Sequence, residues 1–276
     1  MIAVVDYHKG NLKSVERGLI AAGAEAFVTD DAGAIARADA IVLPGVGAFA
    51  DAATTMRDLG QTDVIRRRIA AGVPFLGICL GMHLMFEEGV EGAPEEDDET
   101  STHNAPGLSI LPGVVAKMPP VDQSGTPYKV PHVGWNTVEP TCSVEQTGNV
   151  QSLKQSCSHR QPTRPFGREK QRANSSQDCS PSGTRLVDTA DPFDSPEGSF
   201  ASPLFEGIPS GTYFYFTHSF IAPDGPFAIA KTTHSVTFPC AVHYGEVAFG
   251  VQFHPEKSSD AGARLLRNFV NIAKGA

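Results

Sequence analysis

Short apolar runs alternate with helix-like stretches along the first third of the chain. The runs are IAVVD, EAFVT, DAIVLPG and VPFLGIC, and polar or turn-forming residues separate them. A run of apolar residues without alternation is typical of a strand buried on both faces, and helices between such strands supply the crossovers of a parallel sheet. We therefore predict an α/β fold with a mainly parallel open sheet flanked by helices.

Three helices are expected between these strands, at 11–23, 49–59 and 63–71. The first of them gathers its apolar residues on one face, namely Leu12, Val15, Leu19 and Ile20. After residue 202 the runs TYFYFTHSF, FAIAKTTH, PCAVHYG and VAFGVQFHPE predict four more strands, which turn residues separate. We expect these C-terminal strands to be antiparallel and an amphipathic helix over 261–276 to follow them.

Two segments differ from the rest in composition. Eight of the thirteen residues at 87–99 are acidic, which favours a solvated loop. The stretch 143–202 is rich in Ser, Gln, Pro and Arg and poor in aliphatic residues, so it cannot bury enough apolar surface to offset its ordering entropy. We interpret it as a flexible surface insertion within a single domain that spans 1–276.

Net charge, the length of the apolar runs and the cysteine spacing argue against several classes of function. The net charge of -9 argues against a nucleic-acid partner, which usually requires a basic face. No apolar run is long enough to span a membrane, and the N-terminal run ending in Asp6 is too short for a signal peptide. The five cysteines include no C-x-x-C pair, so neither a disulfide framework nor a metal site is expected. We expect a cytoplasmic protein that needs no cofactor.

Cys79 lies in Gly-Ile-Cys-Leu-Gly, between the run VPFLGIC and the helix-like stretch that begins near Leu80. A lone cysteine is most often a buried, inert thiol. This pattern, however, is the cysteine form of the nucleophile elbow, a sharp strand-to-helix turn that exposes the central side chain. Side chains at Gly77 or Gly81 would collide across the turn. The N-terminus of the following helix would favour the thiolate.

His254 is the histidine best suited to act as a base for Cys79. It follows the last apolar strand in GVQFHPE, and in an extended chain Glu256 would project to the same side. A carboxylate there can fix the tautomer and orientation of the imidazole, which gives a Cys-His-Glu triad. The alternative is a strand-end histidine that merely bonds a neighbouring acid.

An oxyanion site should accompany such a nucleophile. In LPGVGAF, the glycines Gly45 and Gly47 free the backbone around Val46 to turn its N–H groups toward a ligand, together with the amide of Leu80. Taken alone, the same stretch is more typical of an ordinary glycine turn.

Five stretches carry a resemblance to a known family. GICLGM and HPE resemble class I glutamine amidotransferases, and DYHKGNLKSV, LPGVGAF and PHVGWN narrow the resemblance to the glutaminase subunits of imidazole glycerol phosphate synthase. The resemblance covers roughly 1–140 and 203–276. It implies a flavodoxin-like fold and a reaction in which Cys79 attacks the side-chain amide of glutamine. His254 would protonate the departing ammonia, and water would hydrolyse the resulting thioester.

The family also implies a partner and further site residues. The partner is a (β/α)₈ barrel cyclase, which receives the ammonia for histidine biosynthesis in a heterodimer. Gly45, Val46 and Gly47 match the oxyanion strand, whose amide turns inward when the partner is engaged. The substrate or oxyanion site is expected to include also Leu80, His83, His218 and Ser219. The partner-facing surface is expected to include Asn11, Trp135 and Lys257.

The chain departs from the family at two places. His83 replaces a glutamine that usually follows CLGM and helps to hold the substrate, and the insertion at 143–202 is additional. Three alternatives therefore remain: a stand-alone cysteine hydrolase of γ-glutamyl substrates, a glutaminase subunit of another synthase, and a non-catalytic binding module. Full activity without a partner would indicate the first, and a missing triad member would have indicated the last.

Overall fold

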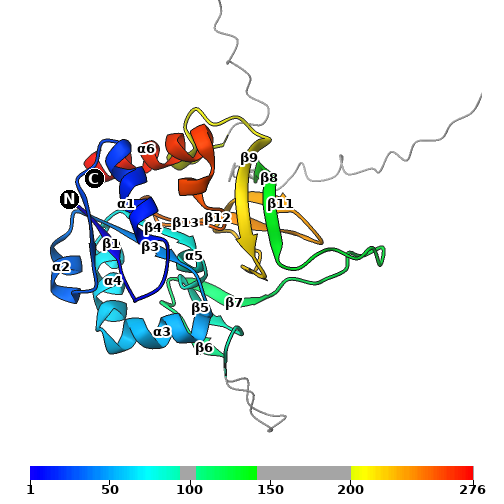
Figure 1. The fold of residues 1–276 in the computed structure, drawn as a ribbon, viewed down its shortest axis with the longest axis horizontal. Coiled ribbons are helices and arrows are strands. Elements are labelled where there is room, and N and C mark those ends of the chain that lie inside the picture. The colour runs from blue at the N-terminus through cyan, green and yellow to red at the C-terminus, as the bar shows by residue number, and fades with distance from the viewer. Residues whose placement is uncertain (94–103, 142–199, 276) are drawn as a thin grey trace, which may run out of the picture. The chain divides into compact units, whose positions relative to one another are not determined.

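The structure is a computed structural model that describes residues 1–93, 104–141 and 200–275. Within these residues, five parallel strands form one half of a large sheet (Figure 1). They lie in the order β2 (Ala26–Thr29), β1 (Ile2–Val5), β3 (Ala40–Gly45), β4 (Phe75–Cys79) and β13 (Ala248–Val251). Every residue of β1, β3, β4 and β13 is buried, as expected of strands that are apolar at each position.

The other half of the same sheet is antiparallel. It continues from β13 through β12 (Thr237–Tyr244), β11 (Ala228–Thr233), β8 (His132–Pro140) and β9 (Thr212–His218). β9 is the last strand on this side, and it pairs with β8 from His132↔His218 to Val138↔Thr212. The strand β8 had no counterpart among the expected elements.

Helices cover both faces of the sheet. The core on one face includes residues of α1 (Leu12–Ala21) and α6 (Ser259–Gly275), and the core on the other face includes residues of α2 (Ala32–Arg37), α3 (Phe49–Asp58) and α4 (Gln61–Ala70). Ile20 was predicted to lie on the apolar face of this helix, and that prediction was wrong, because Ile20 is 52% exposed. Val15 and Leu19 form the buried stripe of α1, and Ile20 lies about 100° farther around the helix than Leu19.

A small second sheet replaces part of the expected acidic loop. It contains β10 (Phe220–Ile221), β7 (Leu111–Lys117), β5 (Phe86–Gly89) and β6 (Ala105–Pro106) in this order. Glu87 and Glu88 belong to β5, where they accept hydrogen bonds from the Gly113 amide and the Asn104 side chain. The prediction of a solvated loop was therefore wrong at its start, and 94–99 lie outside the described residues.

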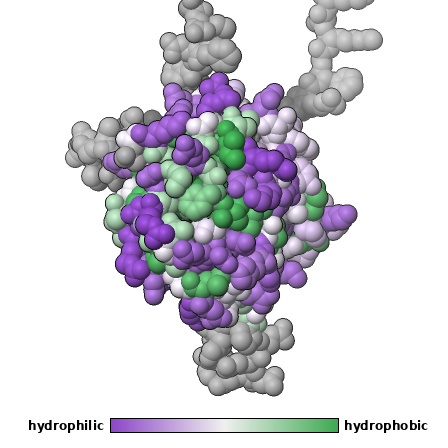
Figure 2. Space-filling view, turned by 60° about the vertical axis from the view of Figure 1, so that its left-hand side comes forward, coloured by the Kyte–Doolittle hydropathy of each residue, from purple (hydrophilic) through white to green (hydrophobic). Residues whose placement is uncertain are grey.

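The expected insertion falls almost entirely outside the described residues, of which only 200–202 overlap it. Phe200 stacks on Phe205 at a centroid distance of 4.3 Å, and Ser202 caps the 3-10 helix η1 (Pro203–Phe205), so these positions pack on the core. No helix in the described ranges has the length and hydropathy needed to cross a membrane. On the side drawn in Figure 2, a group of apolar residues lies among polar ones.

Candidate active site

Cys79 lies at a strained turn between β4 and α5 (Leu80–His83). Its φ of 55° and ψ of -108° lie outside the regions that L-residues favour. A Cβ at Gly77 would lie 2.5 Å from the Gly81 carbonyl oxygen, and a Cβ at Gly81 would lie 1.7 Å from the Leu43 carbonyl oxygen. The steric requirement for both glycines is therefore confirmed, because the turn packs directly against itself and against β3.

The helix expected after Cys79 begins at Leu80, as predicted, and it is short. α5 is one turn of four residues, and the chain then enters β5. The carbonyl groups of Leu84 and Met85 accept hydrogen bonds from the amides of Leu108 and Ile110, so contacts distant in sequence end the helix. The single turn still begins at Leu80, directly after Cys79, and a stabilising effect of its N-terminus on a thiolate stays a prediction.

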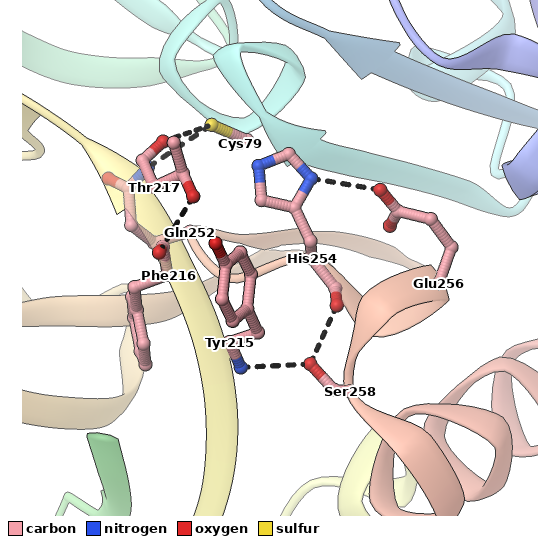
Figure 3. Close-up of polar contacts among 8 residues, drawn as sticks. All are labelled: Cys79, Tyr215, Phe216, Thr217, Gln252, His254, Glu256 and Ser258. Carbon is pink, nitrogen blue, oxygen red and sulfur yellow. Dashed lines mark hydrogen bonds and ion pairs between the residues drawn. The ribbon is translucent and has the colours of Figure 1, made fainter. Parts of the chain in front are cut away.

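His254 lies between Cys79 and Glu256, as Figure 3 shows. Its Nδ1 is 2.9 Å from Glu256 Oε1, and both side chains are buried. The expected geometry was different, because Glu256 lies in the 3-10 helix η2 (Pro255–Lys257) and not in an extended chain. The contact forms because His254 itself is extended and the turn after it carries the carboxylate back toward the imidazole.

A serine missed by the sequence reasoning holds the His254 segment against β9. Ser258 Oγ donates to the His254 carbonyl at 2.6 Å and accepts the Tyr215 amide at 3.0 Å (Figure 3). The His254 amide in turn donates to the Tyr215 carbonyl at 2.9 Å. Three hydrogen bonds thus fix the position of the His254 backbone relative to the last strand of the sheet.

The surroundings of His254 favour its protonated form. Burial alone would lower its pKa, but the contacts with Cys79 and Glu256 outweigh burial and raise the pKa of His254 to about 9. At neutral pH the imidazole therefore carries a proton that it can give to a leaving group.

Two other groups contact the sulfur, and neither was predicted. Cys79 Sγ lies 3.7 Å from the Thr217 carbonyl oxygen and 3.8 Å from Gln252 Nε2. Gln252 Oε1 lies 2.6 Å from His83 Nε2. Burial lowers the pKa of His83 to about 4, partly opposed by this contact, so the imidazole is neutral near pH 7. The only sequence signal for Thr217 and Gln252 is their proximity to the predicted His218 and His254.

The predicted oxyanion loop begins beside the nucleophile. Gly45 is the last residue of β3 and pairs with Cys79 across the sheet. A Cβ at Gly45 would lie 2.0 Å from the hydroxyl of Tyr7, a buried residue that the sequence reasoning did not single out. Gly47 has a φ of 101°, which favours glycine, and Val46 between them is 43% exposed.

One cavity of about 390 Å³ brings most of the predicted residues together. Those that line it are Val46, Gly47, Cys79, Leu80, His83, His218, Ser219, His254 and Lys257. Glu91 lines it as well, and burial raises the pKa of this carboxyl group. Within the described ranges, no group of three or more His, Cys, Asp or Glu residues is placed to hold a metal ion.

The residues expected at a partner interface lie on three elements. Trp135 on β8 is 52% exposed, and its ring meets Tyr215 of β9 edge-on at 6.0 Å. Lys257 Nζ lies 6.0 Å from the centroid of the same Tyr215 ring, and Lys257 also lines the cavity. Asn11 is exposed at the start of α1. An interface role for these residues stays a prediction.

A family model decides where this chain belongs. The model described as glutamine amidotransferase class-I matches residues 3–273. The chain is a class-I glutamine amidotransferase. Two solved structures share the fold of this chain: a glutamine amidotransferase (TM-score 0.58, 17% identity, 99% of this chain and 100% of that one) and PurLQS from Thermotoga maritima (TM-score 0.54, 13% identity, 98% of this chain and 97% of that one).

Curated relatives of this amidotransferase carry a narrower name. "Imidazole glycerol phosphate synthase subunit HisH" of Geobacillus thermodenitrificans is 33% identical, over 100% of this chain and 97% of that protein. The proteins of the same name from Symbiobacterium thermophilum and Nocardia farcinica are 36% and 35% identical. The alignments cover 97% of this chain and 92% of the first protein, and 98% of this chain and 97% of the second.

Proposed function

We propose that this amidotransferase is the glutaminase subunit of an imidazole glycerol phosphate synthase. It hydrolyses glutamine to glutamate and ammonia and passes the ammonia to a synthase subunit for histidine biosynthesis. The observation that carries the proposal is the arrangement of Cys79 and His254 at the ends of adjacent strands, with Glu256 bonded to the imidazole at 2.9 Å. The names of the relatives support the choice of this synthase over others.

The buried triad accounts for each step of the hydrolysis. The Cys79 thiolate attacks the side-chain amide carbon of glutamine, and protonated His254 gives its proton to the nitrogen, which leaves as ammonia. The γ-glutamyl group is now a thioester of Cys79. Neutral His254 then takes a proton from water, and the hydroxide attacks the thioester to release glutamate and the thiolate. The Gly45–Gly47 loop and the Leu80 amide are the proposed donors to the oxyanion in both steps.

The charges in the cavity fit the amino-acid end of a glutamyl substrate. Glu91 and Lys257 both line it, with opposite charges suited to the α-ammonium and α-carboxylate groups of glutamine. His83, His218 and Ser219 supply further polar groups to the same cavity. A γ-glutamyl peptide carries the same free α-ammonium and α-carboxylate groups, so this pair of charges fits the glutamyl part of either substrate.

The relatives are named as subunits of a synthase, which implies a partner subunit. We propose that this partner is the (β/α)₈ barrel cyclase. It would contact the surface around Asn11, Trp135 and Lys257. An exposed tryptophan suits the centre of such an interface, because large aromatic side chains dominate binding energy there.

Glutamate release from glutamine tests the proposal, measured for the wild type and for Cys79→Ala, each with and without the cyclase. We expect slow release by the wild type alone, a large increase when the cyclase and its ligand are added, and no release by Cys79→Ala. Wild-type turnover by Cys79→Ala would exclude Cys79 as the nucleophile. Full activity without any partner would favour a stand-alone hydrolase instead.

A further inference from the structure

The side chain of Gln252 connects the nucleophile to a histidine outside the triad. Gln252 directly follows β13 and is fully buried. One end of its amide, Nε2, lies 3.8 Å from Cys79 Sγ, and the other, Oε1, lies 2.6 Å from His83 Nε2. The sulfur is therefore approached from two directions, by the triad and by a separate His83–Gln252 pair.

The proton on His83 decides which end of the Gln252 amide faces the sulfur. His83 is buried and neutral near pH 7, so its ring has a single N–H. When Nε2 carries this hydrogen, it donates to Oε1 and the amide NH2 group turns toward Sγ. With the hydrogen on Nδ1, Nε2 would accept from the amide, and Oε1 would face the sulfur and repel a thiolate.

We propose that His83 is a positioning residue that holds the Gln252 amide with its NH2 group toward Cys79, so that the amide donates a hydrogen bond to the thiolate. The contacts themselves do not depend on the proposed glutaminase function, but the catalytic value of the thiolate does. A hydrogen bond to a charged acceptor is stronger than one to a neutral acceptor, so the amide favours thiolate over thiol.

This role explains how a histidine functions at position 83. A glutamine there could donate its own side-chain NH2 to Gln252 Oε1, as the His83 ring does. Position 83 requires a hydrogen-bond donor that reaches Gln252. A side chain without such a donor leaves the Gln252 amide free to flip, so that its oxygen faces the sulfur. The variant His83→Gln should therefore retain the effect that His83→Leu loses.

Other titratable groups surround this pair and are unchanged in the variants. His218 of β9 is near His83, and burial lowers its pKa to about 3, so it stays neutral. Its ring bonds the Phe220 carbonyl at 2.8 Å and approaches His132 at 3.1 Å. His254 and Glu256 flank the sulfur from the other side, and Glu91 and Lys257 line the same cavity.

The test measures the reactivity of Cys79 without glutamine or partner. Iodoacetamide is added to the full chain from pH 5 to pH 10, and mass spectrometry of the peptide with Cys79 gives its alkylation rate separately from the other cysteines. We expect His83→Leu and Gln252→Leu each to move the midpoint of the rate–pH curve upward by about one unit. His83→Gln should keep the midpoint near that of the wild type.

The control variant His243→Leu removes an imidazole of β12 that bonds the Gly245 carbonyl, and it should leave the midpoint unchanged.

The double variant His83→Leu/Gln252→Leu tests whether His83 acts on Cys79 through Gln252 or independently of it. If His83 acts through Gln252, the double variant shifts the midpoint no further than either single variant. Additive shifts, or an unchanged midpoint in His83→Leu, would overturn the proposal. If His83→Leu does not fold, His83→Met removes the donor with a more flexible side chain and takes its place. Alkylation needs no glutamine turnover, so a failed glutaminase assay would reject the proposed function while leaving this result intact.

Discussion

Gly81 and Leu43 approach so closely that a Cβ on Gly81 would lie 1.7 Å from the Leu43 carbonyl oxygen. This approach packs the turn after the nucleophile onto β3, two residues before the strand ends at Gly45. Because Gly45 also pairs with Cys79, the nucleophile and the start of the proposed oxyanion loop form one rigid unit. Their relative position is therefore fixed by backbone packing and not by side chains.

The first prediction concerns this packing. We expect Gly81→Ala to lower the free energy of unfolding by about 3 kcal/mol or more and to abolish glutamate release, because backbone atoms cannot yield as a flexible side chain does. Urea unfolding and the glutaminase assay measure the two effects. The matched control is Gly275→Ala, where a Cβ meets nothing within 4 Å. Equal stability of both variants would contradict the close contact.

The second prediction concerns the alkaline side of the pH–rate profile. In the proposed mechanism His254 must be protonated to release ammonia. Burial lowers its pKa, but the contacts with Cys79 and Glu256 outweigh burial and raise the pKa to about 9. Activity should therefore decline above about pH 9. Glu256→Gln removes one of the two stabilising contacts, so we expect the decline to begin about one unit lower. A profile unchanged in Glu256→Gln would mean that the carboxylate does not control the imidazole.

The third prediction concerns stability in acid. An unfolded His83 binds a proton near pH 6.5, whereas burial holds its pKa at about 4 in the folded chain. The unfolded state therefore binds more protons between these values, and the free energy of unfolding falls as pH drops from 6.5 to 4. For this residue the loss is on the order of 3 kcal/mol. His83→Gln should lose correspondingly less stability over this range in urea unfolding. An identical loss in both proteins would show that His83 titrates normally.

The fourth prediction concerns Tyr7. Its hydroxyl is buried against Gly45 and makes no hydrogen bond of normal geometry; burial and Cys79 raise its pKa, and a weaker contact with the Val46 backbone partly opposes them. Removing an unsatisfied buried donor relieves a desolvation cost, so Tyr7→Phe should raise the free energy of unfolding by about 1 kcal/mol. Tyr213→Phe, at an exposed ring, should leave it unchanged. A less stable Tyr7→Phe would mean that the hydroxyl is bonded after all.

The sequence was most informative where local pattern and tertiary role agree. The apolar runs of β1, β3 and β4 predicted buried parallel strands, and the two glycines around Cys79 predicted its strained turn. In contrast, β7 and β8 were not predicted, because their buried positions are interrupted by glycine and by exposed residues. The early end of the helix after Cys79 could not be predicted, since the contacts that end it come from Leu108 and Ile110.

The contacts around the sulfur were harder to predict for a physical reason. Thr217 acts through its backbone carbonyl, which every residue type has, so no sequence pattern marks it. Gln252 is a buried amide in an apolar strand end, and only the fold reveals that Cys79 and His83 lie at its two ends. Motifs marked Cys79, His254 and Glu256 as the proposed triad, whereas the other groups that contact the sulfur carried no such mark.

The parallel pairing of β4 and β13 has an evolutionary consequence. Ile78 pairs with Val251, so Cys79 and Gln252, which are 173 positions apart in the chain, leave adjacent strands at the same level. The gap between such strands is always about 4.8 Å, whatever the length of chain that connects them. Segments could therefore be gained or lost between these two strands over many generations while the reacting groups kept their spacing.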